Sequence, residues 1–287
     1  MYMWYILFFL ATASARVHMI KSDFELMRLN PMNPINVTSV QLQDIVMEEW
    51  QSIVKDCKIL DEKASIKASF DYKLVGTNTL AWASQTLLLV NNVWIPSIST
   101  TDYVGYDFII GVNPQPINGW HIDNDCSDIS FRYDLRTVLR HEILHGIGIG
   151  SSIYNLNGWG LGYNMNGKCY PKLFDTLIED VNGNKVIDGC SFKEDIQSQD
   201  IFVNGVRLYN PIVFRQGSSI SHHVFQGELM FWRLPAMTCL NIGSNEFKIL
   251  AALGIHCPLN PLYESSASSS HHRLLLLVPV MLLLFCI

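Results

Sequence analysis

An α+β fold is the class that the sequence predicts, and three observations predict it. Residues 39–55 carry apolar side chains at helical spacing, and residues 64–74 alternate partly between apolar and polar, which indicates a helix followed by a strand. A short apolar run at 106–112 indicates a buried strand, and an amphipathic helix follows Asp134 as its N-cap. The rest of the chain is rich in Gly and Asn and is expected to be mostly irregular, up to a last helix at 245–253.

The N-terminal region predicts entry into the secretory pathway. Residues 1–15 contain an apolar run followed by Ala13-Ser14-Ala15, a small-x-small cleavage site, and the run is too short to span a membrane. We therefore interpret residues 1–15 as a signal peptide and the polar residues 16–38 as an N-terminal arm or a short pro-segment. The sequon Asn36-Val37-Thr38 predicts N-glycosylation at Asn36.

The C-terminal region predicts attachment to a membrane through a glycosylphosphatidylinositol (GPI) anchor. Residues 259–273 form a serine-rich stalk, in which Ser265 or Ser266 is the expected attachment site. The apolar tail at 274–287 would be removed. A tail anchor is the alternative, but this run includes Pro279 and is shorter than the about 20 apolar residues that a spanning helix needs. Both signals together predict a protein on the extracellular face of the plasma membrane.

Charge and cysteine content narrow the class of protein further. The chain has a formal net charge of -6 and no basic cluster, so nucleic acid is not an expected partner. Of the 7 cysteines, all but Cys286 lie between the two processing signals, and an even number in an exported chain predicts up to three disulfides. Nearness in the sequence suggests the pairs Cys169–Cys190 and Cys239–Cys257, which leaves Cys57–Cys126.

Acidic and amide residues alternate from Asp180 to Asp188, as they do in a calcium-binding loop. An EF-hand loop requires Gly at its sixth position and Glu at its twelfth, and this chain has Lys185 and Ser191 there. We therefore interpret the segment as the turn of a hairpin. Asn204-Gly205 between two short apolar runs predicts a second hairpin.

The motif that points to chemistry reads His141-Glu142-Ile143-Leu144-His145-Gly146-Ile147-Gly148, which has the form H-E-x-x-H-x-x-G. Two histidines four residues apart lie on one face of a helix, where their imidazoles can bind a single Zn²⁺. Glu142 lies on the turn between them and can take a proton from a water beside the metal without binding the metal itself. The motif therefore predicts a zinc site with His141 and His145 as ligands and Glu142 as the general base.

Zinc needs a third protein ligand, and the sequence leaves several choices. The short-spaced pattern would place a histidine three residues after Gly148, where this chain has Ser151. A glutamate on a later helix is one alternative, and Glu246 superficially suits it. A histidine beyond a long insertion is the better one, and the pair His222-His223 offers it. Neighbouring residues of an extended segment point to opposite faces, so only one of this pair is expected to be a ligand.

These residues resemble the metzincin metalloproteases that carry a long insertion, and are similar to leishmanolysin and to secreted bacterial enzymes with an H-E-x-G-H-G-L-G-F-type helix. The likeness covers most of residues 39–258, which would form the catalytic domain. The further segments that carry it are Asp107-Phe108-Ile109-Ile110, Arg136-Thr137-Val138-Leu139, Phe174-Asp175, Gly217-Ser218-Ser219-Ile220-Ser221-His222 and Glu228-Leu229-Met230.

The resemblance implies roles for individual residues. His141, His145 and His222 would bind one Zn²⁺, Glu142 would be the general base, and Met230 would lie in a turn that forms an apolar floor beneath the imidazoles. The spacing from His222 to Met230 is shorter than in the family, which keeps His223 as a rival ligand and Met237 as a rival floor residue.

The resemblance also implies a metzincin-like, two-lobed α+β fold. A mixed twisted sheet and the active-site helix would form the upper lobe, and the lower lobe would be mostly irregular and disulfide-stapled. The strand at 106–112 would border the cleft and bind an extended peptide by β-augmentation. The implied activity is that of a secreted or cell-surface zinc endopeptidase acting on peptides or proteins. The alternatives are an inactive relative that serves in surface adhesion or recognition, and a plain secreted structural domain without zinc.

Overall fold

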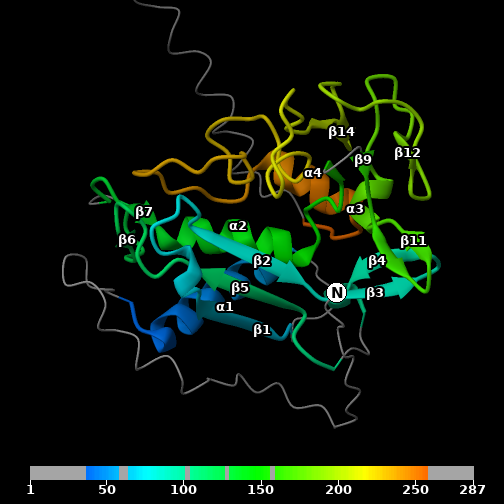
Figure 1. Ribbon diagram of the computed structural model, residues 1–287. Coiled ribbons are helices and arrows are strands. Elements are labelled where there is room, and N and C mark those ends of the chain that lie inside the picture. Colours follow the sequence, from blue (N-terminus) through cyan, green and yellow to red (C-terminus); the bar gives the residue numbers. More distant parts are fainter. Residues whose placement is uncertain (1–36, 58–63, 101–103, 127–128, 156–158, 258–287) are drawn as a thin grey trace, which may run out of the picture.

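The computed structural model describes residues 37–57, 64–100, 104–126, 129–155 and 159–257. The signal peptide, the sequon residue Asn36, both proposed anchor residues Ser265 and Ser266, and the apolar tail lie outside the described residues. The described part confirms the α+β class (Figure 1). None of its helices is long and apolar enough to cross a membrane.

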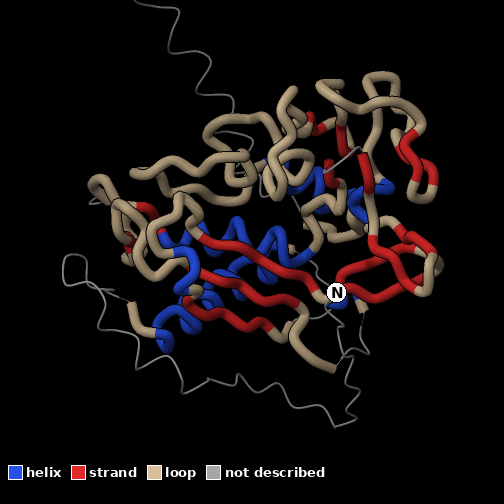
Figure 2. The backbone as a smooth tube through the Cα atoms, in the orientation of Figure 1, coloured by secondary structure: helices blue, strands red, loops and turns tan. Residues whose placement is uncertain are grey.

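A three-stranded sheet and two long helices form the ordered part of the fold. The sheet has the strand order β1 (Ile66–Phe70), β5 (Phe108–Val112), β2 (Ala81–Gln85), with β1 parallel and β2 antiparallel to β5. The helices α1 (Ser39–Asp56) and α2 (Leu135–Ile147) pack on one face of it (Figures 1 and 2). Short 3₁₀ turns at Tyr72–Leu74 and Ser97–Ser99 lie in the connections between strands.

The position of β5 corrects one expectation. The strand expected at 106–112 is present, but β5 is the central strand and pairs with neighbours on both sides, so it has no free edge for a peptide. Alternate residues Phe108, Ile110 and Val112 are completely buried beneath the helices. Among the described strands, the free antiparallel edge belongs instead to β2, in a region whose sequence predicts no clear secondary structure.

Helix α1 begins with a capping box. The Thr38 hydroxyl accepts a hydrogen bond from the Gln41 N–H, and the Gln41 side chain accepts one from the Thr38 N–H. The helix buries an apolar face whose largest member, Trp50, makes an edge-on contact with Phe108 of β5 at 6.2 Å between ring centroids. A buried face on a capped helix next to the central strand is what the amphipathic spacing predicts.

Helix α2 is capped as the sequence indicates, and it runs to Ile147. The Asp134 carboxylate accepts from the Thr137 N–H at 2.8 Å, which satisfies one of the free N–H groups at the helix N-terminus. Gly146 lies inside the helix rather than ending it. A Cβ on Gly146 would lie 2.4 Å from the ring of Phe108, so the glycine allows α2 to lie directly on β5. Gly148, with φ of 136°, is the C-cap.

The remaining elements are short. The strands β3 (Leu87–Val90) and β4 (Val93–Pro96) form a hairpin whose turn residues Asn91 and Asn92 both have positive φ, an arrangement that asparagine tolerates well. A two-residue parallel pair, β6 (Trp120–His121) and β7 (Tyr133–Asp134), precedes α2. The later elements are β8 (Tyr154–Asn155), β9 (Trp159–Gly160), β10 (Tyr163–Met165), β11 (Lys168–Tyr170), α3 (Leu173–Thr176), β12 (Ile187–Asp188), β13 (Ser191–Phe192), β14 (Phe202–Val203), β15 (Val206–Arg207) and α4 (Ser244–Ala252).

One of the two predicted hairpins is present, and the other segment forms a turn with a single bridge. The strands β14 and β15 pair around Asn204-Gly205 as predicted. At the alternating segment, the Asp180 carboxylate accepts from the backbone N–H groups of Asn182 and Asn184, and a single antiparallel bridge joins Glu179 to Lys185. The segment is therefore an Asx-type turn, although β12 pairs with β13 and not across this turn.

Three disulfides are present, and two of the predicted pairings are wrong. Cys169–Cys190 is confirmed, but the other two bridges are Cys57–Cys257 and Cys126–Cys239. Pairing by nearness fails because the chain folds back, so that the end of α1 lies beside the segment after α4.

We call residues 37–148 the sheet half and residues 149–257 the loop half. Two bridges join the halves, whereas only one lies inside the loop half.

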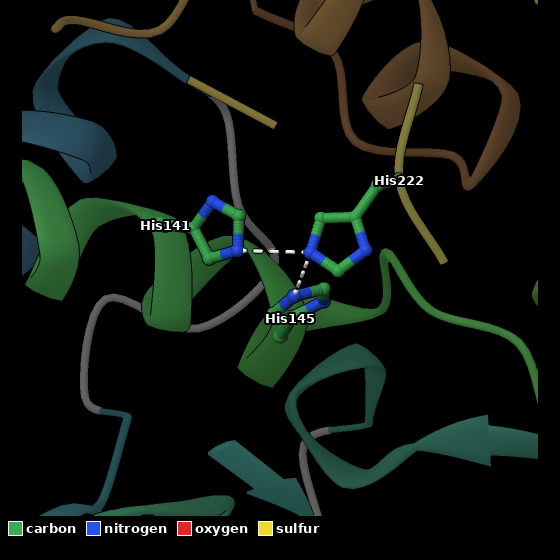
Figure 3. Close-up of side chains that lie close together, drawn as sticks. All are labelled: His141, His145 and His222. Atoms are coloured by element: carbon green, nitrogen blue, oxygen red, sulfur yellow. Dashed lines mark hydrogen bonds between the residues drawn. The ribbon is translucent and has the colours of Figure 1, made fainter. Parts of the chain in front are cut away.

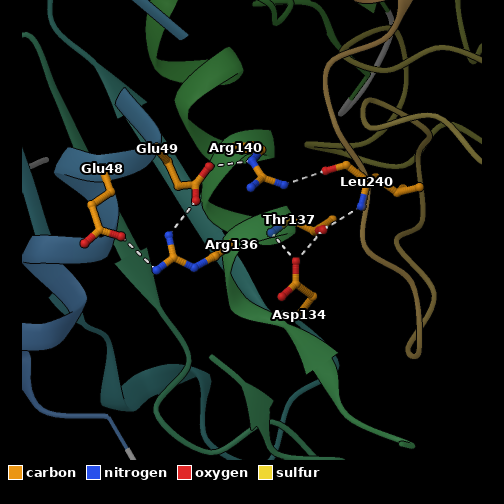
Figure 4. Close-up of polar contacts among 7 residues, drawn as sticks. All are labelled: Glu48, Glu49, Asp134, Arg136, Thr137, Arg140 and Leu240. Carbon is orange, nitrogen blue, oxygen red and sulfur yellow. Dashed lines mark hydrogen bonds and ion pairs between the residues drawn. The ribbon is translucent and has the colours of Figure 1, made fainter. Parts of the chain in front are cut away.

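A buried carboxylate fixes α1 against α2 (Figure 4). Glu49 of α1 is almost completely buried and accepts hydrogen bonds from the guanidinium groups of Arg136 and Arg140 on α2. Arg140 continues to the Leu240 carbonyl oxygen at 2.9 Å, and the Leu240 N–H donates to the Thr137 hydroxyl. The network therefore joins α1, α2 and the loop half through charged groups that have little access to water.

We predict that Glu49→Ala lowers the free energy of unfolding by about 3–5 kcal/mol, because it leaves two partly buried guanidinium groups without their carboxylate. Glu48 also binds Arg136, but its side chain is 57% exposed, so Glu48→Ala is the matched control and should cost about 1 kcal/mol or less. Urea unfolding of both variants measures the difference. Equal losses would contradict the assignment of Glu49 as the central member of the network.

Candidate metal centre

Three imidazoles meet at one point between the two halves (Figure 3). His141 and His145 project from α2, and His222 projects from the segment between β15 and α4. The Nε2 atom of His222 lies 3.1 Å from Nε2 of His141 and 3.2 Å from Nε2 of His145. The three side chains predicted as metal ligands are therefore brought together, although His222 is 77 residues from its nearer partner.

Backbone carbonyl groups fix the orientation of all three rings. The contacts are His141 Nδ1 to Leu229 O at 2.7 Å, His145 Nδ1 to Ile149 O at 2.6 Å, and His222 Nδ1 to Ser218 O at 2.8 Å. A carbonyl oxygen can only accept, so each Nδ1 carries the hydrogen, and each Nε2 of the neutral ring presents a lone pair. This is the arrangement that metal-ligating histidines ordinarily have.

The three rings are neutral in the folded protein. Burial lowers the pKa of His141 to about 4 and that of His222 to about 3, and it holds the pKa of His145 well below its usual value. Three lone pairs with no proton between them repel one another, and a shared cation removes that repulsion. Ligands of a tetrahedral zinc ion lie about 3.3 Å apart, given Zn–N bonds of roughly 2.0–2.1 Å. The cluster can therefore hold a metal ion.

Glu142 lies beside this cluster and is also buried. Burial raises the pKa of its carboxyl group to about 8, because the charged form loses its hydration. A metal ion on the three imidazoles would favour the carboxylate form again. A carboxyl group whose protonation depends this strongly on its surroundings suits proton transfer near neutral pH.

The cluster opens into a cleft of about 510 Å³. The residues that line it include Ala81 to Gln85 of the edge strand β2, and Gln216 to Ser218 and Trp232 of the loop half. Gln85 also donates to the His145 carbonyl oxygen, which attaches the end of β2 to the metal-binding helix. The three histidines and Glu142 therefore face a space that is bordered by an unpaired strand edge.

His223 and Glu246, the rival third ligands, belong to a different site. The Phe225 N–H donates to His223 Nδ1 at 3.2 Å, so the hydrogen of the ring is on Nε2, which donates to Glu246 at 2.9 Å. Glu228 offers a third possible metal-ligand atom near the pair. A metal bound to Nε2 would require the hydrogen on Nδ1, but Nδ1 accepts the hydrogen bond from Phe225. His223 and Glu246 therefore form a buried hydrogen bond, and neither reaches the cluster of three histidines.

The two methionines predicted for the floor of the site differ in burial. Met230 is completely buried, its N–H donates to Glu246 at 2.8 Å, and it follows Leu229, whose carbonyl oxygen orients His141. Met237 is 53% exposed. Only Met230 lies in a turn that is joined to the metal-binding rings, and its role as an apolar floor stays a prediction.

Sequence reasoning missed a buried polar group beside the cleft. Asp175 is completely buried and accepts hydrogen bonds from both hydroxyl groups of Ser151 and Ser152 and from the Ser152 N–H. Ser151 occupies the position where a short-spaced zinc motif would have its third histidine. Lys172, also buried, lines the cleft nearby. The only signal was the Phe174-Asp175 match in the family resemblance, which gave Asp175 no role.

Comparisons with protein-family models, with curated proteins and with solved structures give no match.

We predict that the metal-free protein loses stability as the pH falls from about 6.5 towards about 4. The unfolded chain binds protons at its histidines below pH of about 6.5, whereas burial holds the pKa of His141 near about 4 in the folded state. Stability from these neutral rings is thus complete above the unfolded pKa and is lost on acidification. The melting temperature of chelator-treated protein across this range measures the effect.

The triple variant His141→Gln/His145→Gln/His222→Gln is the control for that pH dependence. It retains polar side chains but has no imidazole at the cluster, so its melting temperature should depend less steeply on pH. An identical slope in the variant would show that other groups cause the pH dependence.

Proposed function

We propose that this protein is a secreted or cell-surface zinc-dependent endopeptidase of the metzincin kind. The observation that carries the proposal is the convergence of three unprotonated Nε2 atoms beside a buried glutamate at an open cleft. The three disulfides support passage through an oxidising compartment, where such enzymes are exported.

Zinc is the metal that we propose for the cluster. Imidazole nitrogen suits Zn²⁺, and three histidine ligands leave the fourth tetrahedral position free, as catalytic zinc sites require. His141, His145 and His222 would hold the ion. When bound, zinc supplies Lewis acidity to a water molecule and to a peptide carbonyl group.

The chain's own residues then carry the proton transfers. Glu142 would accept a proton from the attacking water and return it to the leaving amine. Its position on α2 between the two histidine ligands keeps the carboxylate next to the reacting groups. The hydrogen bonds at the three Nδ1 atoms keep the imidazoles neutral and oriented, so that the ligand geometry needs no rearrangement during the reaction.

The free edge of β2 is the proposed substrate-binding strand. Among the described strands, β2 pairs only with β5, so its other edge has no partner strand, and its residues line the cleft. An extended peptide can add to such an edge with main-chain hydrogen bonds, and the side chains on either side of the strand then determine selectivity. This proposal replaces the expectation for the strand at 106–112.

We predict that Glu142→Gln retains one zinc ion per chain and loses peptidase activity by at least about 100-fold, because the general base is absent and the ligands are intact. His222→Ala should lose both zinc and activity, whereas His256→Ala, an exposed histidine outside the cleft, should keep both. Metal analysis and hydrolysis of a peptide library measure the two properties. A chelator should abolish activity and added zinc should restore it.

The activity of the parent protein decides between an enzyme and an inactive relative. Zinc binding without any hydrolysis by the parent protein would favour a surface recognition protein. Hydrolysis by Glu142→Gln at the parental rate would remove the glutamate from the mechanism.

We also propose that the protein is GPI-anchored at Ser265 or Ser266, as the serine-rich stalk and the apolar tail predict. Phosphatidylinositol-specific phospholipase C should then release it from the cell surface, and mass spectrometry should find no peptide from residues 274–287. Protein that stays on the membrane after this treatment, with the apolar tail intact, would indicate a tail anchor.

A further inference from the structure

A single lysine provides the positive charge of the cleft wall. Lys172 is the only lysine or arginine among the residues that line the cleft, and the residue is only 6% exposed. A Cβ built on Gly150 would lie 3.9 Å from Lys172 Nζ and 3.5 Å from His145 Nδ1. The ammonium group and the His145 ring therefore lie on either side of Gly150, close to each other.

This ammonium group has no hydrogen-bonded partner among the described residues. Lys172 Nζ forms no hydrogen bond or ion pair there, and Asp175 acts on it only through its charge. Its nearest acidic neighbour, Asp175, directs both carboxylate oxygens to Ser151 and Ser152. A charged group that is buried without hydrogen bonds is costly, and such groups are ordinarily paired.

The missing partner is expected to come from outside the protein. Burial lowers the pKa of Lys172 to about 8, so the group is still largely protonated at neutral pH. Lys172 is one of the residues that line the cleft, so a ligand that enters the cleft comes next to this side chain. A ligand that enters the cleft with a carboxylate would give this cation both a hydrogen-bond acceptor and a counter-charge.

We propose that Lys172 is a specificity-determining residue that binds a carboxylate group of the peptide substrate. The inference rests on the proposed peptidase function and adds the substrate class to it. The carboxylate belongs either to an Asp or Glu side chain close to the scissile bond or to the C-terminus of a short substrate. Both sources present the same anion to the same ammonium group, and the experiment separates them.

The test uses the zinc-loaded full-length protein and pairs of fluorogenic peptides. In one series, Glu is compared with Gln at each position on either side of the scissile bond. In the other, peptides with a free C-terminal carboxylate are compared with their amides. The carboxylate form of one series should be favoured by about 10- to 100-fold in kcat/KM, the range of a charge-assisted hydrogen bond. A preference in the first series identifies a side chain, and one in the second identifies the C-terminus.

Variants then assign the preference to Lys172. Lys172→Met should reduce the carboxylate preference to about 1-fold, and Lys172→Arg should keep most of it. Lys168→Met is the matched control, because Lys168 is an exposed lysine on the adjacent strand β11, and its preference should equal that of the parent. Thermal unfolding and zinc content of each variant establish that the fold and the metal site are intact. If Lys172→Met does not fold, Lys172→Arg and the parent still test the proposal.

Failure of this inference can be told apart from failure of the proposed function. Hydrolysis of peptides by the parent with no carboxylate preference in either series would overturn the role of Lys172 and leave the peptidase proposal in place. If the parent hydrolyses no peptide, calorimetric binding of the same peptide pairs to zinc-loaded protein replaces kinetics. Equal affinity for acid and amide forms would then overturn the inference, and a preference lost in Lys172→Met would support it.

Discussion

Three backbone carbonyl groups determine the chemistry of this protein, because they fix where the hydrogens of three imidazoles lie. Each accepts from an Nδ1 atom, so the Nε2 lone pairs of His141, His145 and His222 point at one another. Two lone pairs cannot hydrogen-bond, and burial disfavours a shared proton. The arrangement can therefore hold a cation. The acceptors are the carbonyl groups of Ile149, Ser218 and Leu229, so the loop half orients all three rings as well as supplying His222.

The surrounding fold brings parts of the chain that are distant in sequence to this point. Gly146 allows α2 to lie on the central strand, which fixes the depth of the two helical ligands. Two buried polar contacts then fix the neighbouring elements in position. Glu49 holds the N-terminal half of α2 against α1, and the hydrogen bond between His223 and Glu246 holds the segment that carries His222 against α4. His223, which the sequence made a rival ligand, instead positions the residue next to it.

Local features of the site could be predicted from the sequence, and nonlocal ones could not. The spacing of His141 and His145 and the cap at Asp134 depend on one helix, so they follow from its periodicity. Choosing His222 over His223 needed a family resemblance, because neither residue shows locally which way it points. The free edge of β2 and the unpaired ammonium of Lys172 depend on contacts among distant segments. Asn91-Asn92 did carry a readable hairpin signal, as both residues tolerate positive φ.

The two disulfides between the halves have a consequence for how the protein is made. The partner of Cys57 lies 200 residues further along the chain, and that of Cys126 lies 113 residues away. The disulfides between the halves therefore cannot form until most of the polypeptide has entered the oxidising compartment. The ligand set, which also draws on both halves, is completed late in the same order. A nascent chain held up during export would thus carry the H-E-x-x-H helix without the third ligand.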